Sequence, residues 1–308
     1  MNRKIFLITG GTSGIGFHTA QEIAKEKKTV IITGKNLIKG KKILNQIKNN
    51  ASNDDIHYIN GDLSSQEEIL NIVKVIKKKF SKIDVLINNV GTAYLKRTES
   101  VDGIEKTFAT NHLSYFLITG LLLPLLINSN KSRIVNVSSS IHKKCTHIDF
   151  NDIEMKNSYN VFDAYRQSKL CNILFTYFLS NKLKSRGITV NCLNPGSINT
   201  GFTYIDNRNS ANSYINQTLI KIPRKIYNIS KDMFKKKNLL KNSTNLLSSL
   251  EGAKTSIYLA MDDSLDGITG KYYHKKESLL SSETSYNYNN QKKLWNLSEK
   301  LTNFTYYV

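Results

Sequence analysis

Hydrophobic residues along this chain gather in short runs that alternate with longer segments of mixed polarity. The runs cover residues 4–9, 29–33, 56–60, 83–88, 132–137 and 188–193. Brief, uniformly apolar runs are typical of strands buried on both faces, and several segments between them carry apolar residues at helical spacing. Strands that alternate with helices over short connections build a parallel sheet. The pattern therefore predicts a doubly wound α/β domain.

The later part of the chain adds longer helices to this plan. Residues 101–127 are expected to form one long helix, although Asn111 in its middle is a poor helix former. The most apolar part, 116–127, is too short to cross a membrane and suits a buried helix. A further strand is expected at 270–273. Residues 276–308 are interpreted as a polar tail with a short helix at 292–301, and its ending, 304–308, could pack back on the domain or on a partner.

A glycine-rich turn, TGGTSGIG at residues 9–16, joins the first strand to the first helix. Backbone N–H groups and the helix dipole at such a junction bind anions. Gly10 would permit the tight turn, Gly14 the approach of a phosphate, and Gly16 the packing of helix on strand. The spacing G-x-x-x-G-x-G differs from the usual dinucleotide fingerprint, so the motif alone leaves a plain turn open.

Candidate binding residues also follow the other strands. Gly34, Lys35 and Asn36 follow the second strand without an acid, and a basic residue there favours a ribose 2′-phosphate, hence NADP(H) over NAD(H). A solvated surface lysine is the alternative. Asp62, after the third strand, could accept a bond from an adenine amine or begin the next helix. The fourth, fifth and sixth strands are followed by NNVG at 88–91, three serines at 138–140, and NPGSINT at 194–200. Ligands gather at this edge of a parallel sheet.

A helix is predicted over 162–183, because apolar residues recur at helical spacing without Pro or Gly. Tyr165 and Lys169 are four residues apart and share one face of it. A phenol has a pKa of about 10, and a neighbouring ammonium favours the phenolate. Such a tyrosine can exchange a proton with an alcohol or carbonyl oxygen near neutral pH. Taken alone, the pair could equally be two surface neighbours.

Together these motifs resemble the short-chain dehydrogenase/reductase superfamily in order and approximate spacing over about residues 4–275. The motifs are TGGTSGIG, Asp62 with Leu63, NNVG, Asn111, NVSS, Tyr165-x-x-x-Lys169 and Pro195-Gly196. The stretches RIVNVSS and AYRQSKLCNILFT are similar to the retinol-dehydrogenase-like branch, which mainly uses NADP. The resemblance implies a Rossmann-type sheet of seven parallel strands, ordered 3-2-1-4-5-6-7. It also implies one domain over 1–275 with a helical substrate lid at 201–250.

The resemblance assigns roles residue by residue. Tyr165 would be the general acid/base, and Lys169 would bind the nicotinamide ribose and lower the pKa of the tyrosine. Ser139 would polarise the substrate oxygen, and Asn111 would keep a water that links Lys169 to solvent. The pyrophosphate turn would consist of Gly10, Ser13, Gly14, Ile15 and Gly16. Lys35 would carry the 2′-phosphate, with Ser13 or Asn36 able to hydrogen-bond it.

The remaining cofactor contacts are implied in the same way. Asp62 and Leu63 would meet the adenine, and Asn89 and Gly91 the adenosine side. Val90 stands where the family usually has Ala, which would crowd that side without abolishing binding. The last contacts would close over the nicotinamide: Pro195, Ile198 and Thr200. No metal site is expected.

Charge and cysteine content bear on the possible binding partners and on the cellular compartment. The 308 residues carry a formal net charge of +20, yet the lysines are mostly dispersed, and no nucleic-acid-binding module is recognisable. The three cysteines, Cys145, Cys171 and Cys192, lack metal-ligand spacing, which favours a reducing compartment without disulfides. No signal-peptide pattern opens the chain, so a cytoplasmic location is expected.

The basic segment 221–242 has two interpretations. Apolar residues line one helical stripe of it, and its Lys and Arg residues could face solvent or an anionic membrane. It is expected to be part of the substrate lid, with a peripheral membrane contact as the alternative. Relatives often pair through the helices represented here by 101–127 and 163–186, so a homodimer is implied by analogy alone.

The expected function is that of an NADP(H)-dependent oxidoreductase that interconverts a lipophilic aldehyde or ketone and its alcohol. A catalytically idle dinucleotide-binding regulator is the alternative, but such proteins typically lose the tyrosine or the lysine that this chain keeps at 165 and 169. An enzyme like light-dependent protochlorophyllide reductase shares the layout of the branch, with no specific residue in its favour.

Overall fold

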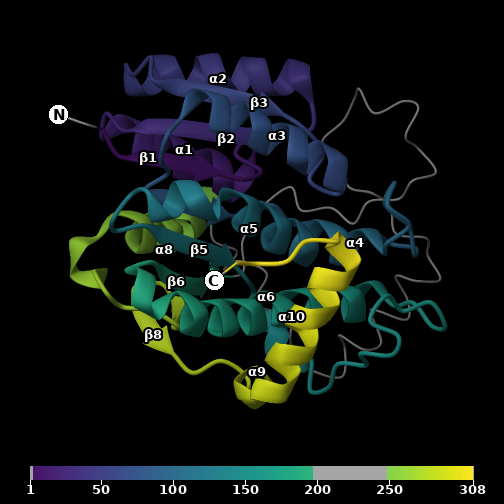
Figure 1. Ribbon diagram of the computed structural model, residues 1–308. Helices are drawn as coiled ribbons and strands as arrows, with labels where there is room; N and C mark the ends of the chain where they lie inside the picture. The colour runs from purple at the N-terminus through teal and green to yellow at the C-terminus, as the bar shows by residue number, and fades with distance from the viewer. Residues whose placement is uncertain (1–2, 197–247, 308) are drawn as a thin grey trace, which may run out of the picture.

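Eight strands form one sheet in the order β3-β2-β1-β4-β5-β6-β7-β8 (Figure 1). The computed structural model describes residues 3–196 and 248–307. The proposed lid at 201–250 lies almost entirely outside these ranges, and the basic segment 221–242 does so completely. The strands are β1 (Ile5–Ile8), β2 (Thr29–Gly34), β3 (Ile56–Asn60), β4 (Val85–Asn88), β5 (Arg133–Val137), β6 (Thr189–Asn194), β7 (Tyr272–His274) and β8 (Glu277–Leu279).

The first seven strands run parallel in the order predicted from the sequence. Their central members are buried on both faces, which explains why their sequences are uniformly apolar. The eighth strand, β8, was not predicted. It pairs antiparallel with β7 at the edge of the sheet and is exposed throughout, so no buried apolar run marks it.

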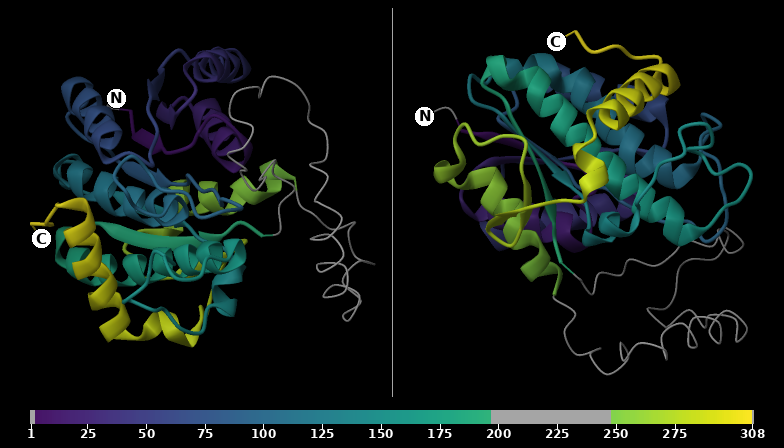
Figure 2. Two further views of the ribbon diagram at one scale, coloured as in Figure 1. Left: turned by 90° about the vertical axis from the view of Figure 1, so that its right-hand side faces the viewer. Right: turned by 90° about the horizontal axis from the view of Figure 1, so that it is seen from below.

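Helices cover both faces of the sheet (Figure 2). The helices α1, α2 and α8 pack on one face, and α3, α5 and α6 on the other, where α10 lies outside α6. Their bounds are α1 (Gly14–Lys25), α2 (Leu37–Ala51), α3 (Gln66–Lys79), α4 (Lys106–Phe108), α5 (Ser114–Ile127), α6 (Val161–Leu183), α8 (Ser249–Met261), α9 (Glu283–Tyr286) and α10 (Tyr288–Thr302).

The single α-helix expected over 101–127 is wrong in two respects. The helix begins only at Lys106, because the buried carboxylate of Glu105 accepts the N–H groups of Thr107 and Phe108 at 2.8 and 2.7 Å and so caps α4. Residues Ala109–Leu113 then form a π-helical turn. Such turns are rare and are often found at functional sites. This one contains Asn111, the poor helix former in the middle of the expected helix.

The helical stretch Lys106–Ile127 is long and apolar enough to cross a membrane, with a mean hydropathy of 1.5, and it is the only such helix in the described part of the chain. However, 83% of its most apolar window is buried inside the fold. It packs between the sheet, α3 and α6, as expected for the core helix that the sequence predicted at 116–127.

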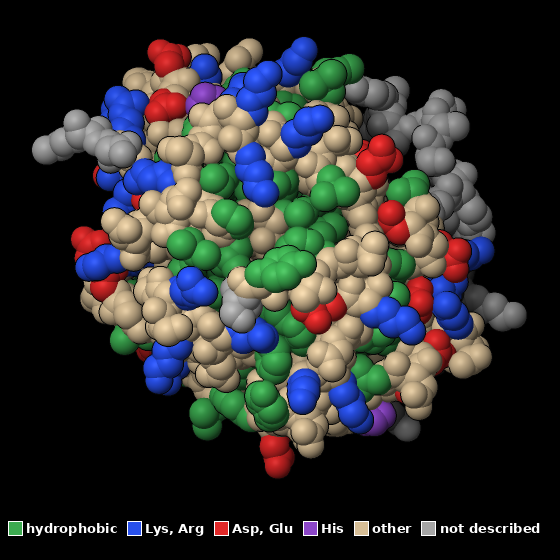
Figure 3. All heavy atoms as spheres, in the orientation of Figure 1, with side chains coloured by type: hydrophobic (Ala, Val, Ile, Leu, Met, Phe, Trp, Pro, Cys, Tyr) green, Lys and Arg blue, Asp and Glu red, His purple; other side chains and the backbone are tan. Residues whose placement is uncertain are grey.

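The C-terminal residues are packed on the domain, which is one of the two arrangements left open for residues 304–308. Trp295 of α10 lies against Phe116 and Phe178, with ring centroids 5.1 and 5.0 Å away. The ring of Tyr306 lies tilted against that of Trp295, with centroids 4.5 Å apart, and its hydroxyl donates to the carbonyl of Phe116 at 2.6 Å. Hydrophobic side chains gather in the middle of this face, with Lys and Arg around them (Figure 3).

Tyr306 and Tyr307 provide a matched test of this packing, because the first is 6% exposed and the second 89%. Tyr306→Ala should lower the free energy of unfolding by about 3–5 kcal/mol, as expected for removing a buried aromatic ring. Tyr307→Ala should change it by less than about 0.5 kcal/mol. Urea unfolding followed by the fluorescence of the single tryptophan measures both values. Equal effects of the two substitutions would contradict the packing.

Candidate active site

A cavity of about 840 Å³ opens at the carboxyl edge of the sheet, where the sequence places its candidate residues. Fifteen of the predicted residues line it: Gly10, Ser13, Gly14, Ile15, Gly16, Lys35, Asn36, Asp62, Leu63, Asn89, Gly91, Ser139, Tyr165, Lys169 and Pro195. Asn111 lies fully buried behind the wall. Ile198 and Thr200 lie outside the described residues.

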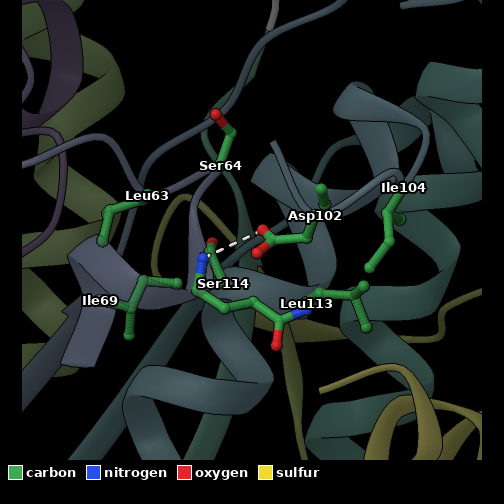
Figure 4. A pocket seen from close by; sticks show the side chains of 9 residues that line it. Leu63, Ser64, Ile69, Asp102, Ile104, Leu113 and Ser114 are labelled. Atoms are coloured by element: carbon green, nitrogen blue, oxygen red, sulfur yellow. Dashed lines mark hydrogen bonds between the residues drawn. The ribbon is translucent and has the colours of Figure 1, made fainter. Parts of the chain in front are cut away.

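A second cavity, of about 10 Å³, lies beside the π-helical turn (Figure 4). Leu63 and Ile69 line one side of it, and Ile104 and Leu113 the other. The carboxylate of Asp102 closes the gap by accepting the N–H of Gln66 at 3.1 Å. A space of this size holds a water molecule at most, so the large cavity is the candidate ligand site.

The glycine turn forms one end of the large cavity. Gly10 and Gly14 have φ angles of 66° and 55°, a left-handed conformation that favours glycine. A Cβ atom on Gly16 would lie 2.4 Å from the carbonyl oxygen of Gly10, so the helix can approach the turn only with glycine there. Ser13 is the N-cap of α1, but its side chain makes no capping hydrogen bond, and no acid lies in the first turn. This helix end is therefore well suited to an anion.

Two lysines border the cavity beyond this turn. Lys35, predicted from the sequence, and Lys39, which was not, both line the wall and are exposed. Lys35 precedes the N-cap of α2 and Lys39 lies in its first turn, so no helical spacing linked the two in the sequence. Asn36 serves as the N-cap of α2, because its Oδ1 atom accepts the N–H of Lys39 at 2.9 Å. That oxygen is thus already used to cap the helix.

Asp62 shapes the loop after β3. Its Oδ1 atom accepts the N–H and the hydroxyl of Ser64, both at 2.9 Å. The cap of α3 is Ser65, whose hydroxyl oxygen accepts the N–H of Glu68 at 3.3 Å, so Asp62 does not cap that helix. The carboxylate nevertheless faces the cavity, where it can still accept a further hydrogen bond.

Asn89 and Gly91 lie in different parts of the wall. The Asn89 amide donates to the carbonyl of Thr9 at 2.9 Å and ties the end of β4 to the glycine turn. Gly91 lies instead beside the lysine of the Tyr–Lys pair: a Cβ atom on it would be 3.1 Å from Lys169 Nζ and 3.7 Å from Asn111 Oδ1. Gly91 therefore borders the end of the cavity away from Lys35.

The side chain of Asn111 makes three hydrogen bonds within the protein. Its Oδ1 atom accepts the N–H of Thr92 at 2.8 Å, and its Nδ2 atom donates to the carbonyl of Thr92 at 2.8 Å and to the hydroxyl of Ser168 at 2.9 Å. Ser168 lies on α6 between Tyr165 and Lys169. The π-helical turn thereby fixes the loop after β4 against the helix that carries the predicted catalytic pair.

Lys169 is 2% exposed, and its ammonium lies 5.6 Å from the ring centroid of Tyr165 and 5.9 Å from that of Tyr115. Its Nζ atom donates to the carbonyl of Val137 at 3.3 Å. Burial lowers the pKa of Lys169 to about 7. Because Tyr165 is only half-buried at the cavity wall, the pair presents a phenol to the cavity with a cation behind it.

Ser138 and Ser139 follow β5 and have different roles. The hydroxyl of Ser138 donates to the backbone carbonyl of Lys169 at 2.7 Å, which fixes the strand end to α6. Ser139 lines the cavity, and its hydroxyl oxygen accepts the N–H of Ile141 at 3.3 Å, so its hydrogen is left to donate elsewhere. Ser139, Tyr165 and Lys169 thus come together at the strand edge.

The chain is similar to known proteins. A family model for short chain dehydrogenases matches residues 4–210. The chain belongs to the short-chain dehydrogenase family. It is 32% identical to polyprenol dehydrogenase of Homo sapiens, over 97% of this chain and 85% of that protein. It is 33% identical to retinol dehydrogenase 14 of Mus musculus, over 97% and 86%.

These relatives place the chain in the retinol-dehydrogenase-like branch, as the sequence motifs predicted. Among solved structures, an uncharacterized protein from Mycobacterium Paratuberculosis matches with a TM-score of 0.73 and 25% identity, over 99% of this chain and 96% of that one. The chain is thus an oxidoreductase of this family with the expected fold.

The buried ammonium of Lys169 should make stability depend on pH. Below about pH 7 both the folded and unfolded states carry the proton, whereas between about 7 and 10.5 the unfolded state binds more protons. The free energy of unfolding should therefore rise with pH in that window, by up to about 1.4 kcal/mol per pH unit.

Lys169→Met, which removes the titrating group, should abolish this gain. Urea unfolding at pH 6 and pH 9 should show wild type gaining about 2–3 kcal/mol relative to the variant. Lys184→Met, at an exposed position just after α6, should leave the wild-type pH dependence intact. Parallel profiles for wild type and Lys169→Met would argue against a buried titrating ammonium.

Proposed function

We propose that the protein is an NADP(H)-dependent oxidoreductase that interconverts an alcohol and a carbonyl, with Tyr165 as the general acid/base. The observation that carries the proposal is the shared cavity, which has an anion-binding helix end at one part of its wall and Tyr165, Lys169 and Ser139 at another. Its volume of about 840 Å³ falls in the range of cofactor sites.

The residues of the glycine turn fit a dinucleotide. The N–H groups at the start of α1 are not capped by Ser13, and the glycines leave the approach to them open. They would hold the pyrophosphate, while Asp62 would accept a hydrogen bond from the adenine. Gly91 lies beside Lys169, so it would border the nicotinamide end rather than the adenosine end expected for it. When bound, the cofactor supplies or accepts the hydride.

The side chains of this protein would handle the proton. In alcohol oxidation, the Tyr165 oxygen takes the hydroxyl proton of the substrate, and in carbonyl reduction it returns a proton to that oxygen. The positive charge of Lys169 favours the phenolate form of Tyr165. The Ser139 hydroxyl donates a hydrogen bond to the substrate oxygen and holds it near the phenol.

Asn111 would serve a proton path behind this pair. Its amide hydrogens are both used on protein acceptors, so a water bound at Asn111 would be held through an oxygen atom, either Oδ1 or the backbone carbonyl. Oδ1 and the Lys169 ammonium converge on Gly91, which supports a water-mediated link there.

The preference for NADP(H) rests on Lys35 and Lys39. Both flank the part of the cavity where the ribose 2′-oxygen would lie, and no acid follows β2. A 2′-phosphate gains from two exposed cations, whereas a 2′-hydroxyl would need an acceptor. Since Asn36 Oδ1 is occupied, Asn36 would contribute only through its amide nitrogen.

The substrate is proposed to be a lipophilic alcohol or its carbonyl. The named relatives act on polyprenol and retinol, which are both long apolar alcohols. A cytoplasmic protein with peripheral membrane contact would meet such substrates, and sedimentation with anionic liposomes tests that contact. A homodimer is also proposed by family analogy, although α10 occupies the outer side of α6, and a monomer mass in solution would refute it.

Tyr165→Phe should abolish turnover, because the phenyl ring keeps the shape but lacks the proton. Wild type and variant are compared by NADPH oxidation with retinal, and by NADPH fluorescence for binding. The rate should fall at least about 1,000-fold while the dissociation constant of NADPH changes less than about threefold. Substantial residual turnover would assign the proton to another group. Cofactor binding without turnover of any carbonyl by wild type would favour the idle regulator.

Reversing a positive charge near the proposed ribose site should weaken the use of NADPH more than the use of NADH. Lys35→Glu and Lys39→Glu should each lower kcat/KM for NADPH about 10- to 100-fold, while NADH loses little, because only NADPH carries the 2′-phosphate. Lys41→Glu, at an exposed position of α2 outside the cavity, is the control. A wild-type preference for NADH would overturn the cofactor assignment.

A further inference from the structure

His142 lies directly behind the loop that carries Ser139. It belongs to a short 3₁₀ helix, η2 (Ser140–Lys144), and its side chain is completely buried. The ring nitrogen Nδ1 is 2.6 Å from the backbone carbonyl oxygen of Ser139, and the backbone N–H of His142 donates to the same oxygen at 3.2 Å. The ring therefore contacts the backbone of the residue whose hydroxyl faces the cavity.

The other ring nitrogen meets the C-terminal part of the chain. The backbone N–H of Ser282 points to His142 Nε2 at 3.1 Å. A backbone N–H can only donate, so Nε2 must be an unprotonated acceptor, and a carbonyl can only accept, so Nδ1 must carry the hydrogen. These two partners fix one neutral tautomer and one orientation of the ring.

The segment that presents Ser282 is itself fixed to α6. The hydroxyls of Ser281 and Tyr177 lie 2.7 Å apart, and Ser281 also meets the hydroxyl of Ser285 at 2.6 Å. Tyr177 lies on the same helix as Tyr165. The ring of Tyr272, from β7, packs edge-on against His142 at 5.0 Å. A polar chain thus runs from α6 through 281–282 and His142 to Ser139.

We propose that His142 is a positioning residue, which holds the Ser139 loop in register with α6 by bridging the Ser139 carbonyl and the Ser282 N–H. The role rests on the proposed function, because it concerns the serine that polarises the substrate oxygen. Without the hydrogen bond from Nδ1, the Ser139 carbonyl keeps only the longer bond from the backbone N–H of His142, and the loop is free to shift. Small displacements of a catalytic group cost large factors in rate.

Two substitutions separate the two halves of the bridge. Asparagine can keep a donor near the position of Nδ1 but loses the acceptor for Ser282, whereas glutamine can keep an acceptor near the position of Nε2 but loses the donor to Ser139. The control position is His147, an exposed histidine in the same connection. All variants are made in the full chain.

The first readout is hydrogen exchange of the 138–145 amides, which needs no substrate. His142→Gln should speed this exchange about tenfold or more, and His142→Asn should stay within about threefold of wild type. The His147 variants should not change it. Unchanged exchange in His142→Gln would overturn the positioning role, whatever the enzyme turns over.

The second readout is turnover with retinal and NADPH. His142→Gln should lower kcat about 10- to 100-fold with KM for NADPH within about threefold, and His142→Asn should rescue most of kcat. Equal losses in both variants, with equal drops in melting temperature, would mean a merely structural histidine. If the wild-type protein turned over none of the carbonyls tested, the proposed function would be refuted. The hydrogen-exchange experiment would still decide the role of His142.

Discussion

The burial of the Lys169 ammonium is the constraint on which the active site depends. Removing such an ion from water costs several kcal/mol, and the surrounding structure must offset that cost. The ammonium donates to the carbonyl of Val137, and two aromatic rings face it. Ser138 fixes the backbone of the same lysine. The end of β5 and the helix α6 are thus built around one charge, which lies beside the ring of Tyr165.

The π-helical turn also helps to build the surroundings of Lys169. By changing the helical register between α4 and α5, it turns Asn111 toward the loop after β4, where the amide bonds both Thr92 and Ser168. Asparagine in the interior of a regular helix costs stability. The poor helix former is therefore stabilised by tertiary hydrogen bonds, and the wall behind Lys169 is rigid as a result.

Sequence patterns predicted the seven parallel strands and the residues that line the cavity, because buried strands and glycine turns leave local signatures. The π-helical turn was missed, since its hydrogen-bond register depends on contacts between Asn111 and distant residues. The C-terminal packing was left open because the large buried side chains Trp295 and Tyr306 lie in a segment of polar composition. Lys39 and His142 gain their meaning only from neighbours in space, and the exposed β8 carries no periodic signal.

The C-terminal segment has a consequence for how the protein matures on the ribosome. Residues 281–306 cover α5 and α6 and contact the loop that carries Ser139, but they are translated after the elements that they cover. Every earlier nascent chain therefore exposes the aromatic face around Phe116 and Phe178, a surface that chaperones recognise. Ribosome-bound chains of increasing length would reveal the point at which this face closes. The glycine turn can form early, but the Ser139 loop gains its final support only after residues 281–282 have been translated.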